Sequence, residues 1–124
     1  MNIVLADREA ELMEVLWDHG PCTVAEVRDR VSDDLAYTTV LSMLRTLETK
    51  GYVTRHADGK AHRYVAAVQR DAAQRSALRA ISAKFFKGST AMLLTHLVAD
   101  EKLSDADARR LRALLAKRPR KTSK

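Results

Sequence analysis

The sequence has one cysteine, two prolines, 5% aromatic residues and no long hydrophobic run. A single cysteine excludes a disulfide framework and a zinc site built from several cysteines. The longest stretch without a charged residue, 88–99, is shorter than the roughly 20 apolar residues of a membrane span. The N-terminus lacks the basic start of a signal peptide. We therefore expect a cytoplasmic protein, and a hydrophobic content of 46% predicts a folded chain.

Charge is distributed unevenly along the 124 residues, whose formal net charge is +6. Residues 1–37 hold nine acids and three bases, whereas residues 38–70 hold six bases and two acids. Residues 71–124 hold thirteen bases and five acids. An acidic first third followed by basic segments indicates one face suited to a polyanion, with a merely solvated basic surface as the alternative.

Three helices are predicted in the first fifty residues. The first spans residues 7–19 and ends at Gly20-Pro21, since glycine caps a helix and proline cannot continue it. The second begins at Thr23, where Thr23 and Glu26 have the spacing of a capping box. The third spans residues 37–50 and stops at Gly51.

The third helix has two different faces. Its apolar residues are Val40, Met43, Leu44 and Leu47, which cluster on one side at 3.6-residue spacing. The opposite face is short-chained and rich in hydroxyls, whereas a solvated helix face usually carries Glu and Lys. This helix is therefore expected to approach a partner closely.

A β-hairpin is predicted after the third helix. Two short β-prone runs, 52–56 and 61–65, flank residues 57–60, which include an Asp-Gly pair typical of a hairpin turn. Three helices followed by a basic hairpin predict a winged helix-turn-helix. The fold class is therefore mainly α with a small β wing, and residues 1–70 are the predicted DNA-binding domain.

Residues 71–117 are predicted to form three further helices, 71–87, 90–99 and 105–117, which are too few to bury their own apolar stripes. A second copy of the chain could cover these stripes, so we expect a homodimer that matches a two-fold-symmetric DNA operator. Residues 118–124 are a predicted disordered basic tail. The residues expected to bear dimerisation are Leu78, Ile81, Phe85, Leu93, Leu97, Leu111 and Leu114.

The third helix and the hairpin carry the residues expected to contact double-stranded DNA. Arg45 suits a bidentate contact to guanine or a phosphate contact, and short hydroxyl side chains suit bases or phosphates. Cations on the hairpin suit phosphate or the minor groove. The predicted set is Tyr37, Thr38, Thr39, Leu41, Ser42, Arg45, Thr46, Arg55, Lys60 and Arg63.

Other chemistry has little support in the sequence. His56 and His62 near Asp58 could hold a metal, but such histidines are more often solvated, and no metal or cofactor is predicted. Cys22 at a helix start is expected to be an inert thiol. No nucleophile–base motif or phosphate loop occurs, so neither an enzyme nor a small-molecule substrate is expected. A winged-helix module that binds protein instead of DNA is the alternative function.

The sequence resembles the BlaI/MecI penicillinase-repressor family, which also includes the CopY copper-responsive repressors. The resemblance covers residues 5–117 and is strongest over the first 65. The segments that carry it are residues 5–17, 23–27, 35–40 (Leu-Ala-Tyr-Thr-Thr-Val), 44–53 and 61–64 (Ala-His-Arg-Tyr).

The resemblance implies a cytoplasmic dimeric repressor with an N-terminal winged helix and C-terminal dimerisation helices. In β-lactam-responsive members, a membrane sensor metallopeptidase signals the antibiotic, and the repressor is cut between Asn and Phe. That bond aligns with His96–Leu97, the candidate cleavage bond, where both residues differ from the family's. Copper-responsive members carry a cysteine-rich C-terminal hook, which a chain whose one cysteine is Cys22 lacks. Ala6 stands where the family often has a hydroxyl cap.

Overall fold

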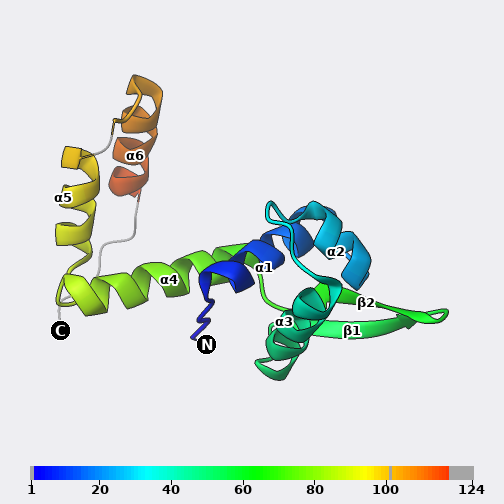
Figure 1. Cartoon of the computed structure of the whole chain (residues 1–124). Coiled ribbons are helices and arrows are strands. Elements are labelled where there is room, and N and C mark those ends of the chain that lie inside the picture. Colours follow the sequence, from blue (N-terminus) through cyan, green and yellow to red (C-terminus); the bar gives the residue numbers. More distant parts are fainter. Residues whose placement is uncertain (1, 101, 118–124) are drawn as a thin grey trace. The chain divides into compact units, whose positions relative to one another are not determined.

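The computed structural model describes residues 2–100 and 102–117 (Figure 1). The predicted tail, residues 118–124, lies outside the described residues. The elements in chain order are α1 (Asp7–His19), α2 (Val24–Arg30), α3 (Tyr37–Thr49), β1 (Val53–Asp58), β2 (Ala61–Ala66), α4 (Arg70–Phe85), α5 (Thr90–Asp100) and α6 (Asp105–Lys117). The predicted mainly α fold with a small β wing is confirmed.

The chain divides into two compact units, of which the first ends at Ile81 and the second begins at Ser82. The first unit contains α1–α3, the β1–β2 hairpin and most of α4. Figure 1 shows the hairpin projecting from the three-helix body, with β1 beside α3. The predicted domain boundary at residue 70 falls at the first residue of α4, before the first compact unit ends at Ile81.

The core of the first unit comes from the apolar faces that the sequence pattern predicts. Leu12, Met13 and Leu16 of α1 pack with Val27 of α2 and with the buried face of α3. On α3 the buried residues are Val40, Leu44 and Leu47, while Met43 is half-buried against the core. Burying this face of α3 leaves its opposite face directed outward.

Side-chain caps set the beginnings of the first two helices. The predicted capping box of α2 is confirmed: the Thr23 N–H donates to Glu26 Oε1 at 2.9 Å, and the Glu26 N–H donates to Thr23 Oγ1 at 3.2 Å. At α1, Ala6 has no side-chain oxygen to offer, but its N–H donates to Glu9 Oε1 at 2.9 Å. Half of a capping box therefore remains at α1.

The first strand of the hairpin is longer than predicted. β1 extends to Asp58, which pairs with Ala61, so the loop is the two residues Gly59 and Lys60. Gly59 has a φ of 64°, which suits the first position of a tight hairpin turn. The predicted Asp-Gly pair lies at this turn, but the first strand extends two residues beyond the predicted run 52–56, because Ala57 and Asp58 join the ladder.

Ion pairs attach the remaining segments of the first unit to α1. Arg8 pairs with Asp33 at 2.5 Å, in the connection between α2 and α3. Arg70, at the start of α4, reaches Glu14 at 2.8 Å and Asp18 at 2.5 Å. These acids therefore serve contacts within the first unit, beside the segment that precedes α3 and at the start of α4.

The second unit has no buried residue on α5 or α6 among the residues described. Figure 1 shows these two helices next to each other, and an apolar hollow of about 320 Å³ is lined by residues of both, including Leu94, Val98, Leu111 and Leu114.

In residues 2–100 and 102–117, no helix is long and apolar enough to cross a membrane.

Glu9 is the carboxylate that fixes α1 to the end of α3. Its side chain is nearly buried, and Lys50 Nζ donates to its two oxygens at 2.9 and 3.0 Å. Burial acts to raise the pKa of Glu9, but the hydrogen bonds from the Ala6 N–H and Lys50, with the Lys50 charge, outweigh it and hold the pKa below its ordinary value.

Replacing Glu9 by Gln tests this contact. The variant keeps the acceptor for Ala6 but loses the attraction to Lys50, so we expect a loss of about 1–3 kcal/mol in the free energy of unfolding at pH 7. Because the folded-state pKa is lowered, this stability is present above the unfolded pKa of about 4.3 and is lost as the pH falls through the folded value. Denaturant unfolding followed by Trp17 fluorescence measures the difference.

Asp7→Asn is the matched control, because Asp7 lies in the same first turn and has no ion-pair partner among the described residues. Its unfolding free energy should follow that of the unchanged protein across the same pH range. A Glu9→Gln deficit that stays constant down to pH 3 would contradict the assigned role of the Lys50 contact.

Candidate nucleic-acid interface

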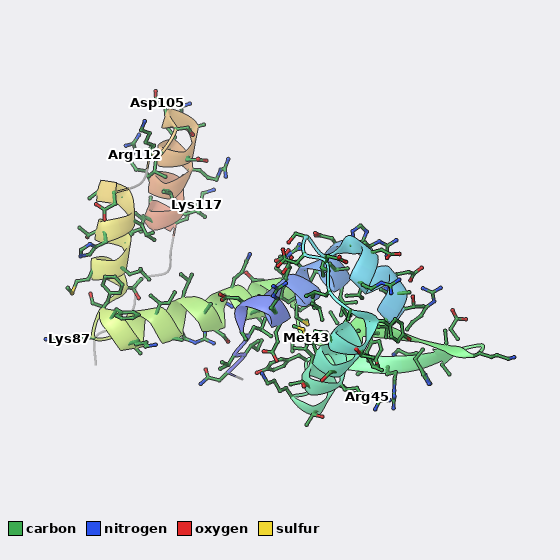
Figure 2. The ribbon with its side chains drawn as sticks, in the orientation of Figure 1. Met43, Arg45, Lys87, Asp105, Arg112 and Lys117 are labelled. Carbon is green, nitrogen blue, oxygen red and sulfur yellow. The ribbon has the colours of Figure 1, made fainter. Side chains whose placement is uncertain are left out.

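The outward face of α3 is a strip of short polar side chains with one arginine. Thr38, Ser42, Arg45 and Thr46 are all exposed, and Leu41 beside them is half-buried. In Figure 2, Met43 lies on the side of α3 toward the other helices and Arg45 on the side next to the hairpin. The structure thus brings these predicted residues together on one surface.

The hydroxyl groups of this strip are not equivalent. Thr46 Oγ1 donates to the Ser42 carbonyl at 3.1 Å, and Thr49 Oγ1 donates to the Arg45 carbonyl at 3.0 Å. In the described part of the chain, the hydroxyls of Thr38 and Ser42 make no such bond. These two side chains therefore keep their donors for an external partner.

A groove of about 380 Å³ separates α3 from the hairpin and the start of α2. Tyr37 and Arg45 line its α3 side, and Arg55, Lys60 and His62 line its hairpin side. Both walls therefore carry positive charge. Among the described residues, neither Arg45 nor Lys60 has a carboxylate within ion-pair distance, so both charges remain available to an anion.

The two hairpin arginines already have acidic partners. Arg55 Nε lies 3.6 Å from Glu48 Oε2 of α3. Arg63 Nε donates to Asp58 Oδ2 at 2.6 Å, and its Nη1 donates to Glu26 Oε1 at 2.8 Å. The Asp58 hydrogen bond first, and the Glu26 charge second, raise the pKa of Arg63.

Thr39 and Tyr37 differ in their relation to the groove. Thr39 is exposed on α3 but does not line the groove, whereas Tyr37 does. Tyr37 is 46% exposed, and the guanidinium of Arg28 lies 5.9 Å from the centre of its ring. Sequence reasoning missed Arg28, because its proximity to Tyr37 depends on how α2 and α3 pack.

The described residues give little support to a metal site or a reactive cysteine. Within residues 2–100 and 102–117, no group of three His, Cys, Asp or Glu side chains is placed to hold a metal ion. Cys22 is fully buried, and Arg30 Nη1 donates to its sulfur at 3.2 Å. His56 Nε2 lies 3.3 Å from Thr54 Oγ1.

The residues predicted to bear dimerisation are all incompletely buried in the single chain. Leu78, Ile81 and Phe85 of α4 are exposed by 43–68%, and Leu93 and Leu111 are half-buried. Leu97 and Leu114 are 47% and 59% exposed on α5 and α6. The candidate cleavage bond, His96–Leu97, lies inside α5, and the ring of His96 is 5.4 Å from that of Phe86.

Known proteins resemble this chain in sequence and in fold. A sequence model of the family described as "Penicillinase repressor" matches residues 5–117. "Transcriptional regulator BlaI" of Mycobacterium tuberculosis (strain H37Rv) is 37% identical over 110 residues, which are 86% of this chain and 80% of that protein.

Solved structures also resemble this chain. The DNA-binding domain of the repressor BlaI superposes with a TM-score of 0.51 and 26% identity, over 56% of this chain and 88% of that one. A MarR family protein from Bacillus stearothermophilus shares the fold. It superposes with a TM-score of 0.51 and 21% identity, over 94% of this chain and 74% of its own.

The family match spans nearly the whole chain, and the superposed BlaI DNA-binding domain shares its fold with 56% of this chain. Transcriptional regulators are not an enzyme class. The chain therefore belongs to the penicillinase repressor family, as a transcriptional repressor with a winged-helix DNA-binding fold.

Proposed function

We propose that this protein is a homodimeric repressor that binds a two-fold-symmetric operator in double-stranded DNA, acting in the cytoplasm. The α3 helix enters the major groove, and the β1–β2 hairpin, called the wing from here on, meets the neighbouring backbone. The observation that carries the proposal is that Arg45 and Lys60, on the two walls of one groove, have no carboxylate partner among the described residues. The DNA-binding domain is residues 1–70.

The face of α3 suits base edges because its side chains are short. Thr38 and Ser42 keep free hydroxyls, Arg45 can reach guanine in a bidentate manner, and Leu41 can contact a thymine methyl. Tyr37 and Lys60 suit phosphates at the two edges of this face. Thr39, Thr46 and Arg55 complete the proposed contact set, while Arg63 is occupied by two carboxylates.

The uncovered leucines of the C-terminal helices support self-association. Residues 71–117 expose Leu97, Leu114 and Leu115 by about half of their surface. Exposed large apolar side chains that gather on one part of a protein often mark a protein contact. A second copy offers the same leucines, so a symmetric dimer covers both sets and carries two DNA-binding heads.

Repression ends, in this proposal, when the dimer is lost. Two linked heads gain effective concentration on a dyad operator, so a monomer binds far more weakly. Cutting α5 at His96–Leu97 would separate α6 from the rest of the chain. A membrane sensor metallopeptidase is the candidate protease, and it would require local unwinding of α5 because the bond lies within a helix.

The alternative, a module that binds protein and not DNA, rested on the acidic first third. Most of these acids serve contacts within the chain, as with Glu9 to Lys50, Glu14 and Asp18 to Arg70, and Asp33 to Arg8. This pairing leaves less acidic surface for an external basic partner and favours the DNA-binding function.

Binding over a salt series tests the proposed function. The probe is a labelled duplex that the protein selects from a random-sequence library, and the control is a scrambled duplex of the same composition. We expect preference for the selected duplex, two chains per duplex, and a steep linear fall of log affinity with log salt concentration, because phosphate contacts release counterions. Equal affinity for both duplexes, or a flat salt response, would favour the protein-binding alternative.

Arg45→Ala tests the placement of α3. Loss of a base contact should weaken binding to the selected duplex by about 1–3 kcal/mol and relax the preference at one base position. Arg75→Ala is the matched control, because Arg75 is an exposed arginine of α4 that pairs with Asp71. If Arg45→Ala binds as tightly as the unchanged protein, α3 does not read the DNA as proposed.

Leu114→Gln tests the dimerisation surface. Leu114 is 59% exposed in the single chain, so the change leaves the fold of one copy intact while placing an amide in the shared interface. We expect a shift toward monomer in analytical ultracentrifugation and weaker operator binding. Arg109→Gln, on an exposed position of the same helix, should leave the association constant unchanged. A fully dimeric Leu114→Gln protein would place the interface elsewhere.

A further inference from the structure

We propose that Glu26 positions the wing for DNA binding through a bridge formed by Glu26, Arg63 and Asp58, so that Arg63 holds the wing instead of contacting DNA. This inference rests on the proposed DNA-binding function. Glu26 was identified from the sequence only as a helix cap, and Arg63 only as a DNA contact.

The bridge joins three elements of the first unit. Arg63 lies on β2, Asp58 ends β1 beside the turn, and Glu26 lies in the first turn of α2. The guanidinium donates from Nε to Asp58 at 2.6 Å and from Nη1 to Glu26 at 2.8 Å. One side chain therefore links the outer half of the wing to the helix that packs against α3.

Glu26 is itself held in place. Its Oε1 accepts the Thr23 N–H at 2.9 Å, and the same oxygen accepts Arg63 Nη1. The pKa of Glu26 lies below its ordinary value, first because of the Thr23 hydrogen bond and then because of the Arg63 charge. The carboxylate thus stays ionised at neutral pH in an orientation that the helix cap fixes.

The wing needs such a bridge because its outer part has no core of its own. Val53 and Tyr64 are buried at its base, and Tyr64 exchanges two backbone hydrogen bonds with Cys22, at 2.7 and 3.1 Å. From Thr54 to His62 every residue is exposed. An isolated two-stranded hairpin is marginally stable in water, so the outer wing depends on side-chain contacts to keep its direction.

The direction in which the DNA affinity changes when the charge of Glu26 is removed tests this inference. A carboxylate beside a DNA-binding surface repels phosphate, so removing its charge tightens binding when the carboxylate has no other role. A carboxylate that positions the wing has the opposite effect, since removing it lets Lys60 and its neighbours move away from the backbone.

Glu26→Gln is the decisive variant, because glutamine also suits this position of a capping box and the start of α2 is kept. With the duplex selected by the unchanged protein, we expect Glu26→Gln and Arg63→Gln each to weaken binding about two- to fivefold per wing, the range of exposed ion pairs. The double variant should bind no more weakly than either single one, because both changes break one bridge.

The salt dependence separates positioning from contact. Loss of a phosphate contact lowers the slope of log affinity against log salt by about 1, whereas Arg63→Gln should leave the slope unchanged. Lys60→Gln, which removes a proposed phosphate contact, is the positive control for a lowered slope. Glu14→Gln is the neutral control, because it removes a glutamate of α1 that pairs with Arg70 of α4, and Asp18 still holds Arg70.

Backbone order parameters of the free protein give a readout that needs no DNA. Glu26→Gln should lower them in residues 57–62 and leave those of α1 unchanged. Any of four results would overturn the proposal. Glu26→Gln binds DNA as tightly as the unchanged protein or more tightly, or the double variant loses as much affinity as the product of the two single losses. Alternatively, Arg63→Gln lowers the salt slope, or the order parameters of residues 57–62 stay unchanged in Glu26→Gln. If the unchanged protein selects no duplex, the proposed function fails, and the order parameters still test the bridge.

Discussion

The burial of one face of α3 is the constraint on which the rest of the structure depends. Val40, Leu44 and Leu47 are fully buried, and their spacing fixes the rotation of the helix about its axis. With that rotation fixed, the opposite face presents Thr38, Ser42 and Arg45 on one surface. The helical period thus turns a pattern of apolar residues into one exposed polar face on the opposite side of α3. A shift of the pattern by one residue would turn Arg45 by about 100° and remove it from the groove that it shares with the wing.

The uneven distribution of charge has a structural explanation. Acids of the first third make ion pairs within the first unit. Glu9 pairs with the residue that caps the end of α3, Asp33 pairs from the connection before α3 to α1, and Glu26 pairs with an arginine of the wing. Of the described bases on α3 and the wing, Arg45 and Lys60 have no carboxylate within ion-pair distance, and both line the groove. Internal pairing of the acids lowers the repulsion that a DNA backbone would otherwise meet at this surface. A net charge of +6 would not reveal this division, because it adds paired and free charges together.

Local signals made most of the first unit predictable. The glycine at the end of α1, the Thr23–Glu26 spacing and the two faces of α3 are each written within a few residues, and the structure confirms the helices that they predict. The Asp-Gly turn of the wing was predicted, but the first strand extends two residues beyond its predicted run, because strand pairing continues through Ala57 and Asp58. The contacts of Arg63 could not be predicted, since Glu26 is 37 residues away and the cation–carboxylate pair forms only after the hairpin folds back on α2. The same holds for Arg28 beside Tyr37, which arises from helix packing.

The claim that α3 and the wing form one DNA-binding surface is tested most directly by mapping that surface in solution. The measurement is a titration of isotope-labelled full-length protein with the duplex that it selects, followed by backbone amide chemical shifts. The account predicts large shift changes in residues 37–46 of α3 and 55–62 of the wing, with α1 little affected. Changes centred on the acidic face of α1, or on α5 and α6 alone, would contradict it.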